Sequence, residues 1–89
     1  MNNKELKKTM ANITAEIKEH IITLSEGSSG WKKELCLVSW NESAPKYDIR
    51  DWSEDYQKCG NGITLTENEA RELIKGLQSV LVNDTLALK

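Results

Sequence analysis

The strongest structural signal in the chain is a helix start at Thr66-Glu67-Asn68-Glu69. In this capping box, the threonine hydroxyl and the carboxylate three residues later each accept a hydrogen bond from a backbone N–H that would otherwise be unpaired. Apolar residues then recur at helical spacing, at Ala70, Leu73, Ile74, Leu77, Val80 and Leu81. We therefore expect one amphipathic helix that begins after Thr66 and ends near Asn83.

The segment before this helix has the composition and alternation of β-strands. Its first part is rich in β-branched residues, a glycine- and serine-rich turn follows, and Pro45 later interrupts the pattern because proline cannot donate to a strand ladder. Strands are predicted over residues 14–24, 31–40, 46–52 and 62–66. The predicted fold class is α+β, with a four-stranded curved antiparallel sheet followed by one C-terminal amphipathic helix.

Alternation assigns the strand side chains to two faces. The expected buried face carries the clear hydrophobes, which are Leu35, Leu37, Tyr47, Ile49, Ile63 and Leu65. The opposite face carries Glu34, Cys36, Val38, Trp40, Lys46, Asp48, Arg50 and Trp52. Trp40 and Trp52 are therefore expected to be exposed, to lie in a dimer contact or to bind a ligand.

The chain of 89 residues is expected to form one small domain over residues 13–83. Residues 1–12 are predicted to be a flexible or weakly helical leader, and residues 84–89 a short tail. The apolar residues are too few to cover both a sheet face and a helix stripe, so we expect a homodimer through helix and sheet.

Charge and cysteine content exclude several classes of protein. Twelve basic residues against 14 acidic ones give a net charge of -2, which as a total argues against a polyanionic partner. No apolar run reaches the length of a membrane span and no signal-peptide core follows the N-terminus, so a cytoplasmic location is expected. Cys36 and Cys59 lack the spacing of a disulfide framework or a zinc knuckle. No cofactor or metal is expected.

The five aromatic residues all lie within residues 31–56, interleaved with basic residues. Single-stranded nucleic-acid surfaces have this composition, because bases stack on aromatic rings while cations contact phosphates. The candidate nucleic-acid-binding residues are Trp31, Lys32, Lys33, Trp40, Lys46, Arg50, Trp52 and Lys58. Tyr47 is in phase with Ile49 and is expected to be a core residue instead.

Two catalytic or metal-binding alternatives have weaker support. Acidic residues cluster at Asp48, Asp51, Glu54 and Asp55, as in a metal-dependent hydrolase, but no partner histidine lies near them. His20 with the two cysteines offers soft ligands without motif spacing, and a single histidine on a strand is more often structural. The chain is therefore not expected to be an enzyme.

Three ordered motifs carry a family resemblance: Asp48-Ile49-Arg50, Gly62-Ile63-Thr64-Leu65, and the capped helix. The chain resembles the positive cofactor four family of transcriptional coactivators, most closely its bacterial YdbC-type members, over roughly residues 13–82. The resemblance implies a homodimer that binds single-stranded DNA with little sequence preference, with RNA also possible, and a link to transcription machinery or DNA maintenance.

By position, the resemblance implies that Arg50 faces phosphates and that Trp52 lies at or beside a stacking aromatic. It also implies cations at Lys32, Lys33 and Lys46 on the hairpin. Gly60-Asn61 stands where the family has a basic pair, with Lys58 as the nearest substitute. The alternative is a protein-interaction or transcription adaptor module whose sheet binds no nucleic acid.

DNA binding also requires the sheet to sort its charges by face, because residues 31–58 are not basic in total. We expect Lys32, Arg50 and Lys46 on one surface, with Glu42, Glu54 and Asp55 on loops.

Overall fold

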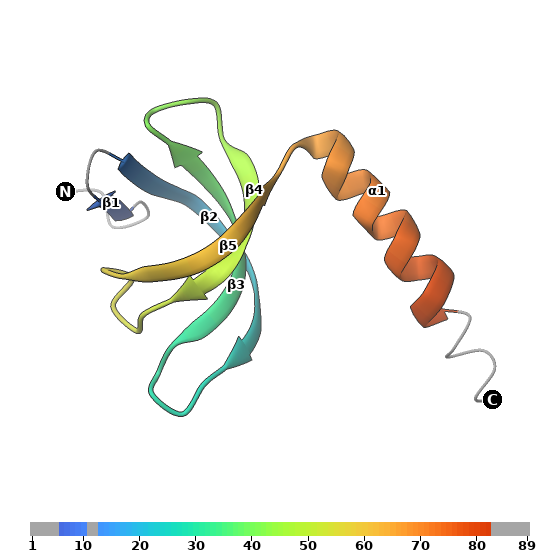
Figure 1. Cartoon of the computed structure of the whole chain (residues 1–89), viewed down its shortest axis with the longest axis horizontal. Coiled ribbons are helices and arrows are strands. Elements are labelled where there is room, and N and C mark those ends of the chain that lie inside the picture. Colours follow the sequence, from blue (N-terminus) through green and yellow to red (C-terminus); the bar gives the residue numbers. More distant parts are fainter. Residues whose placement is uncertain (1–5, 11–12, 83–89) are drawn as a thin grey trace.

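A computed structural model describes residues 6–10 and 13–82 of the chain. Five strands form one antiparallel sheet in the order β1-β2-β3-β4-β5, and a helix follows the last strand (Figure 1). The strands are β1 Leu6–Met10, β2 Ile13–Glu26, β3 Lys32–Trp40, β4 Lys46–Trp52 and β5 Cys59–Leu65. Helix α1 spans Glu67–Leu77 and continues as a π-helical turn, Gln78–Val82. No helix in the described ranges is both long and apolar enough to cross a membrane.

The four predicted strands and the helix are confirmed, and the sheet has one additional strand. β1 pairs with the first part of β2, with Leu6 opposite Ile17 and Met10 opposite Ile13. It lies inside the leader, where the sequence predicts loose helical turns or no order, because pairing with a neighbouring strand is a tertiary effect that a short segment does not encode. The rest of the leader, the tail and the predicted helix stop at Asn83 lie outside the described residues.

The sheet is curved, and its longest strand pair shows how (Figure 1). The pairing of β2 with β3 shifts register between Ile17 and Glu19, again between His20 and Ile22, and a third time between Thr23 and Ser25. Each such irregularity bends the strand and increases its twist. The three shifts together wrap β2 around the core.

The capping box predicted from sequence is present at the start of α1. The Thr66 hydroxyl accepts a hydrogen bond from the Glu69 N–H at 3.2 Å, and the Glu69 carboxylate accepts one from the Thr66 N–H at 2.8 Å. These contacts satisfy two of the donors that a helix N-terminus leaves unpaired. The helix start is therefore encoded locally, independent of the sheet.

The structure corrects the expected identity of the buried face. The fully buried apolar side chains are Ala15, Ile17, Cys36, Val38 and Trp52, with Trp40, Tyr56 and Cys59 packed against them. We call this the inner face of the sheet. The opposite or outer face carries Leu35, Tyr47 and Ile49, which are only half-buried in the single chain. Ile63, also expected to be buried, is 54% exposed.

Helix α1 leaves its apolar stripe uncovered and buries none of its residues. It projects from the end of β5 away from the inner face (Figure 1). Between the helix and the outer face lies a groove of about 510 Å³, whose lining includes Leu35, Tyr47, Ile49, Leu73, Ile74 and Leu77. Two apolar surfaces, one from the sheet and one from the helix, therefore face a shared open space.

Candidate nucleic-acid interface

Strand pairing brings the expected cations Lys32, Lys46 and Arg50 to one face of the sheet. Lys32 pairs with Trp52 across β3 and β4, Glu34 with Arg50, and Val38 with Lys46. Residues paired across strands share a face, so all of these side chains belong to the inner face. The acidic residues Glu42, Glu54 and Asp55 are exposed and lie outside the strands. The expected sorting of charges by face is thus present only in part, because Glu26 is exposed on β2 directly opposite Lys32.

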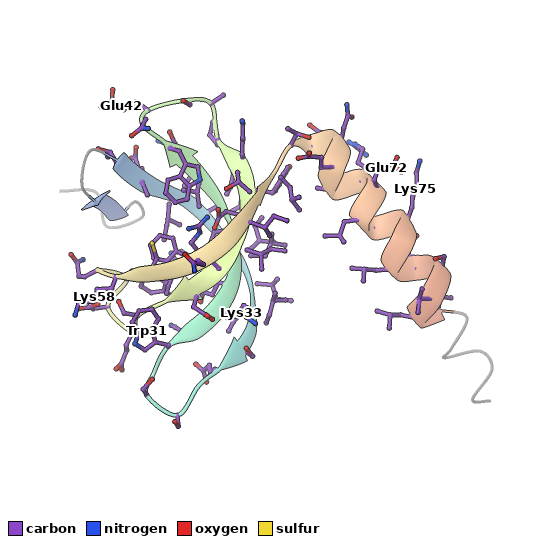
Figure 2. All side chains as sticks on the ribbon, viewed as in Figure 1. Trp31, Lys33, Glu42, Lys58, Glu72 and Lys75 are labelled. Atoms are coloured by element: carbon purple, nitrogen blue, oxygen red, sulfur yellow. The ribbon has the colours of Figure 1, made fainter. Side chains whose placement is uncertain are left out.

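The other two predicted cations differ in position, and of these only Lys33 lies on the outer face. Lys33 falls on the outer face, opposite Asp51. Lys58 is exposed just before β5. Figure 2 shows Lys58 and Trp31 on the side of the sheet that faces away from α1. The eight predicted binding residues therefore do not form one continuous surface.

Arg50 is the most constrained of the predicted cations. Its Nε donates to Asp48 Oδ1 at 2.6 Å, a terminal nitrogen donates to Asp48 Oδ2 at 2.9 Å, and the other donates to the Gly60 carbonyl at 3.2 Å. Its guanidinium also lies over the Trp40 ring, 4.7 Å from the ring centre. Burial opposes the charged form, but the Asp48 carboxylate outweighs it and raises the pKa of Arg50.

The resemblance implies that Arg50 faces phosphates, and in the structure its guanidinium is directed at Asp48 and the Gly60 carbonyl. Its side chain is only 13% exposed, and Asp48 is fully buried. Thr64 donates a further hydrogen bond to Asp48 Oδ2 at 2.9 Å. The Asp48–Arg50 pair therefore connects β4 to β5 inside the protein. The Asp48 carboxylate neutralises the positive charge of Arg50.

The tryptophans also differ from expectation. Trp52 is 1% exposed, so its ring is a core element and not a surface for stacking. Trp40 is half-buried beneath the Arg50 guanidinium. Both indole N–H groups are buried without a hydrogen-bond partner among the residues described. Sequence alternation put both rings on the correct side of the sheet, but that side is the interior one.

Trp31 remains partly exposed and lines a polar cavity of about 370 Å³. The other lining residues are Ser29, Ser53, Glu54, Asp55 and Lys58. The turn from β4 to β5 is held in place here, because the Asp55 carboxylate accepts hydrogen bonds from the Ser53 hydroxyl at 2.9 Å and the Gln57 N–H at 3.0 Å. These two bonds lower the pKa of Asp55, with the Gln57 bond having the larger effect.

Glu34 forms a polar centre on the inner face that the sequence pattern does not reveal. Its buried carboxylate accepts hydrogen bonds at 2.9 Å from the Thr23 hydroxyl and at 2.9 Å from the Tyr56 hydroxyl. His20 Nδ1 lies 3.1 Å from its other oxygen. Burial by itself would raise the pKa of Glu34, but the hydrogen bonds from His20, Thr23 and Tyr56 outweigh it and the pKa is lowered.

Tyr56 reaches Glu34 from a strained position. Its φ is 61°, in the left-handed region that few bulky side chains adopt, and its N–H donates to the Ser53 carbonyl at 2.9 Å. Lys32 lies over its ring at 4.8 Å, and the ring meets His20 edge-on at 4.9 Å. Tyr56 comes from the polar turn between β4 and β5, so no strand periodicity in the sequence could reveal that it turns back onto the sheet.

Two comparisons with known proteins match part of this chain. The family model for Transcriptional Coactivator p15 (PC4) matches residues 28–76, which is more than half of the chain. An uncharacterized protein of Treponema pallidum (strain Nichols) is 53% identical over 47 residues, covering 53% of this chain and 55% of that protein. The chain thus spans about half the length of this curated relative.

The matched segment runs from the turn before β3 into helix α1 and includes the Asp48–Arg50 pair. The chain belongs to the PC4 family of transcriptional coactivators.

Proposed function

We propose that the protein is a non-catalytic, single-stranded DNA-binding homodimer with little sequence preference that acts in transcription regulation or DNA maintenance. The observation that carries this proposal is the arrangement of charge in a PC4-family sheet: Lys32 and Lys46 share the inner face, whose acidic residues on β3 and β4 are buried. A curved sheet with cations and an accessible aromatic ring is suited to a flexible strand, because every base has a face that can stack.

The direct contacts are assigned to the accessible residues among the eight candidates. Lys46 and Lys58 are exposed, and Trp31 is partly exposed beside Lys58 in the polar cavity. Lys32 contributes a further positive charge near the same loop, since its ammonium lies over the Tyr56 ring. Arg50, Trp40 and Trp52 support this surface from within, and Lys33 contributes only from the outer face.

Substitution of exposed lysines tests this assignment without disturbing the core. Lys46→Ala and Lys58→Ala are each expected to weaken binding to a mixed-sequence single-stranded oligonucleotide at low salt. For each lysine–phosphate interaction that a substitution removes, the slope of log K against log salt is expected to decrease in magnitude by about 0.7. Fluorescence anisotropy across a salt series measures both quantities.

Lys75→Ala is the matched control, because Lys75 is exposed on α1 and pairs only with Glu72 at 3.0 Å in the described structure. Its binding and salt slope are expected to match those of the unchanged protein. Equal losses of affinity in all three variants would contradict the assignment to the inner face and its loops.

The homodimer is proposed because the groove between α1 and the outer face leaves so many apolar side chains exposed. Leu73 is 41% exposed, Ile74 54% and Leu77 49%. Fully burying an exposed side chain of this kind contributes about 1.5–3 kcal/mol, so covering several half-exposed ones on helix and sheet favours association with a second copy.

Ile74→Glu is expected to convert the dimer into a monomer, because a carboxylate in an apolar interface loses its hydration. Light scattering after size-exclusion chromatography measures the mass of each species. Lys75→Ala on the next residue of the same helix is expected to remain dimeric. A monomeric unchanged protein, or an Ile74→Glu variant of unaltered mass, would refute the proposed interface.

A further inference from the structure

Three potential metal ligands meet on the inner face, outside the residues proposed to contact DNA directly. His20 Nδ1 lies 3.1 Å from Glu34 Oε1 and 3.8 Å from Cys36 Sγ, and that sulfur lies 3.6 Å from the same carboxylate oxygen. One nitrogen, one oxygen and one sulfur atom therefore form a triangle with sides of 3.1, 3.6 and 3.8 Å.

This triangle has the dimensions of a tetrahedral zinc site. Zinc–nitrogen and zinc–oxygen bonds of about 2.0–2.1 Å and a zinc–sulfur bond of about 2.3 Å put neighbouring ligand atoms about 3.3–3.6 Å apart. The observed separations of 3.1, 3.6 and 3.8 Å bracket these values, so the ligands need to move by only a few tenths of an ångström.

The fold brings the three ligands together through strand pairing. His20 on β2 is the direct partner of Cys36 on β3, and Glu34 precedes Cys36 by two residues on the same face. The register shift after His20 lies next to this pair. Because the ligands come from two strands that are distant in sequence, no ligand spacing in the sequence could reveal the cluster.

The surroundings complete the features of a metal site. Glu34 uses Oε1 toward the other two ligands, while Thr23 and Tyr56 each donate to Oε2 at 2.9 Å. Metal-binding carboxylates are typically held by such outer hydrogen bonds. A carboxylate and a thiolate together balance the charge of a divalent ion. The Lys32 ammonium lies 4.0 Å from Glu34 Oε2, the carboxylate oxygen that does not face the other two ligands.

We propose that His20, Glu34 and Cys36 form a three-ligand Zn²⁺ site that fastens β2 to β3. Glu34 and Cys36 are buried, whereas the His20 side chain is 40% exposed, so the ion reaches the site past the histidine and keeps a water molecule as its fourth ligand. On binding, the sulfur–zinc bond replaces the sulfur–hydrogen bond of Cys36, and the released proton passes to the solvent.

Cobalt substitution tests the site with a spectroscopic signal. Co²⁺ alone, added to the reduced full chain, is expected to bind one ion per chain, with visible bands of tetrahedral cobalt and a thiolate-to-cobalt charge-transfer band. Zn²⁺ is expected to displace it and abolish both signals. His20→Gln, at an exposed position, is expected to weaken Co²⁺ binding by more than about tenfold.

The two cysteines provide a matched pair of variants. Cys36→Ser is expected to lose the charge-transfer band, whereas Cys59→Ser, outside the triangle, is expected to keep it. Circular dichroism of His20→Gln establishes that at least one ligand variant is folded. Absence of the band in the unchanged protein, or full-strength binding by His20→Gln, would overturn the site and leave the cluster as a hydrogen-bond network only.

Discussion

Asp48→Ala is expected to lower the free energy of unfolding by about 3–5 kcal/mol, because breaking a buried ion pair leaves its partner charged and unpaired. Asp48 is fully buried and accepts hydrogen bonds from Arg50 at 2.6 and 2.9 Å and from Thr64 at 2.9 Å. Since small domains have total stabilities of about 5–15 kcal/mol, the variant is expected to approach the limit of folding. Urea denaturation at a fixed protein concentration measures the loss of stability.

Asp51→Ala is the control on the same strand. Asp51 is only half-buried and forms no salt bridge among the described residues, so its removal is expected to change the free energy of unfolding by about 0.5 kcal/mol or less. Similar losses of stability in the two variants would show that the buried pair does not stabilise the fold.

The same pair affects how DNA-binding variants are interpreted. Arg50→Ala would leave the Asp48 carboxylate buried without its ion-pair partner, so weaker DNA binding by that variant would combine misfolding with any direct effect on the bound strand. Lys46 and Lys58 are exposed and avoid this ambiguity.

Gly62→Ala is expected to destabilise the protein by about 3 kcal/mol, which corresponds to a fall in Tm of roughly 12–24 °C for a domain of this size. Gly62 lies opposite Arg50 in the β4–β5 ladder. A Cβ there would overlap the Arg50 Cβ and the Ile49 carbonyl oxygen, and would lie 2.9 Å from Arg50 Nε. The backbone oxygen cannot move without breaking the sheet, and the Arg50 side chain cannot move without breaking its pair with Asp48.

Gly60→Ala is the control for the loss of stability that replacing any glycine in this strand would cause. Its added Cβ would meet only the Asp51 Cβ, at an ordinary van der Waals distance of 3.8 Å. We expect its Tm to stay within a few degrees of the unchanged protein. A Gly62→Ala variant with the same Tm as Gly60→Ala would mean that β5 moves freely relative to Arg50.

Strand alternation and the capping box were sufficient to predict four of the five described strands and the start of the helix. β4 has the predicted bounds, and α1 begins directly after Thr66. Alternation could not show which face is buried, because it divides side chains into two sets without indicating what covers each. Here the face that carries charges is the interior one, where Asp48 and Glu34 accept hydrogen bonds from Thr64 and Thr23 on neighbouring strands.

The candidate site was predicted less completely, because strand alternation assigns a side chain to a face without showing what it contacts. Lys32, Lys46 and Arg50 do share a face, as expected from their phase in the strands. The pairing of Arg50 with Asp48 depends on side-chain conformation, and the contact of Tyr56 with Glu34 depends on a turn with a positive φ. Neither has a periodic signature in the sequence.

The most direct measurement of the proposed function is the affinity of the unchanged protein for a labelled, mixed-sequence single-stranded oligonucleotide and for the matching duplex, followed by fluorescence anisotropy at several salt concentrations. We predict tighter binding to the single strand, with log K falling linearly as log salt rises. Absence of binding at low salt, or equal affinity for the duplex, would contradict the proposed function and favour an adaptor whose sheet does not contact single-stranded DNA.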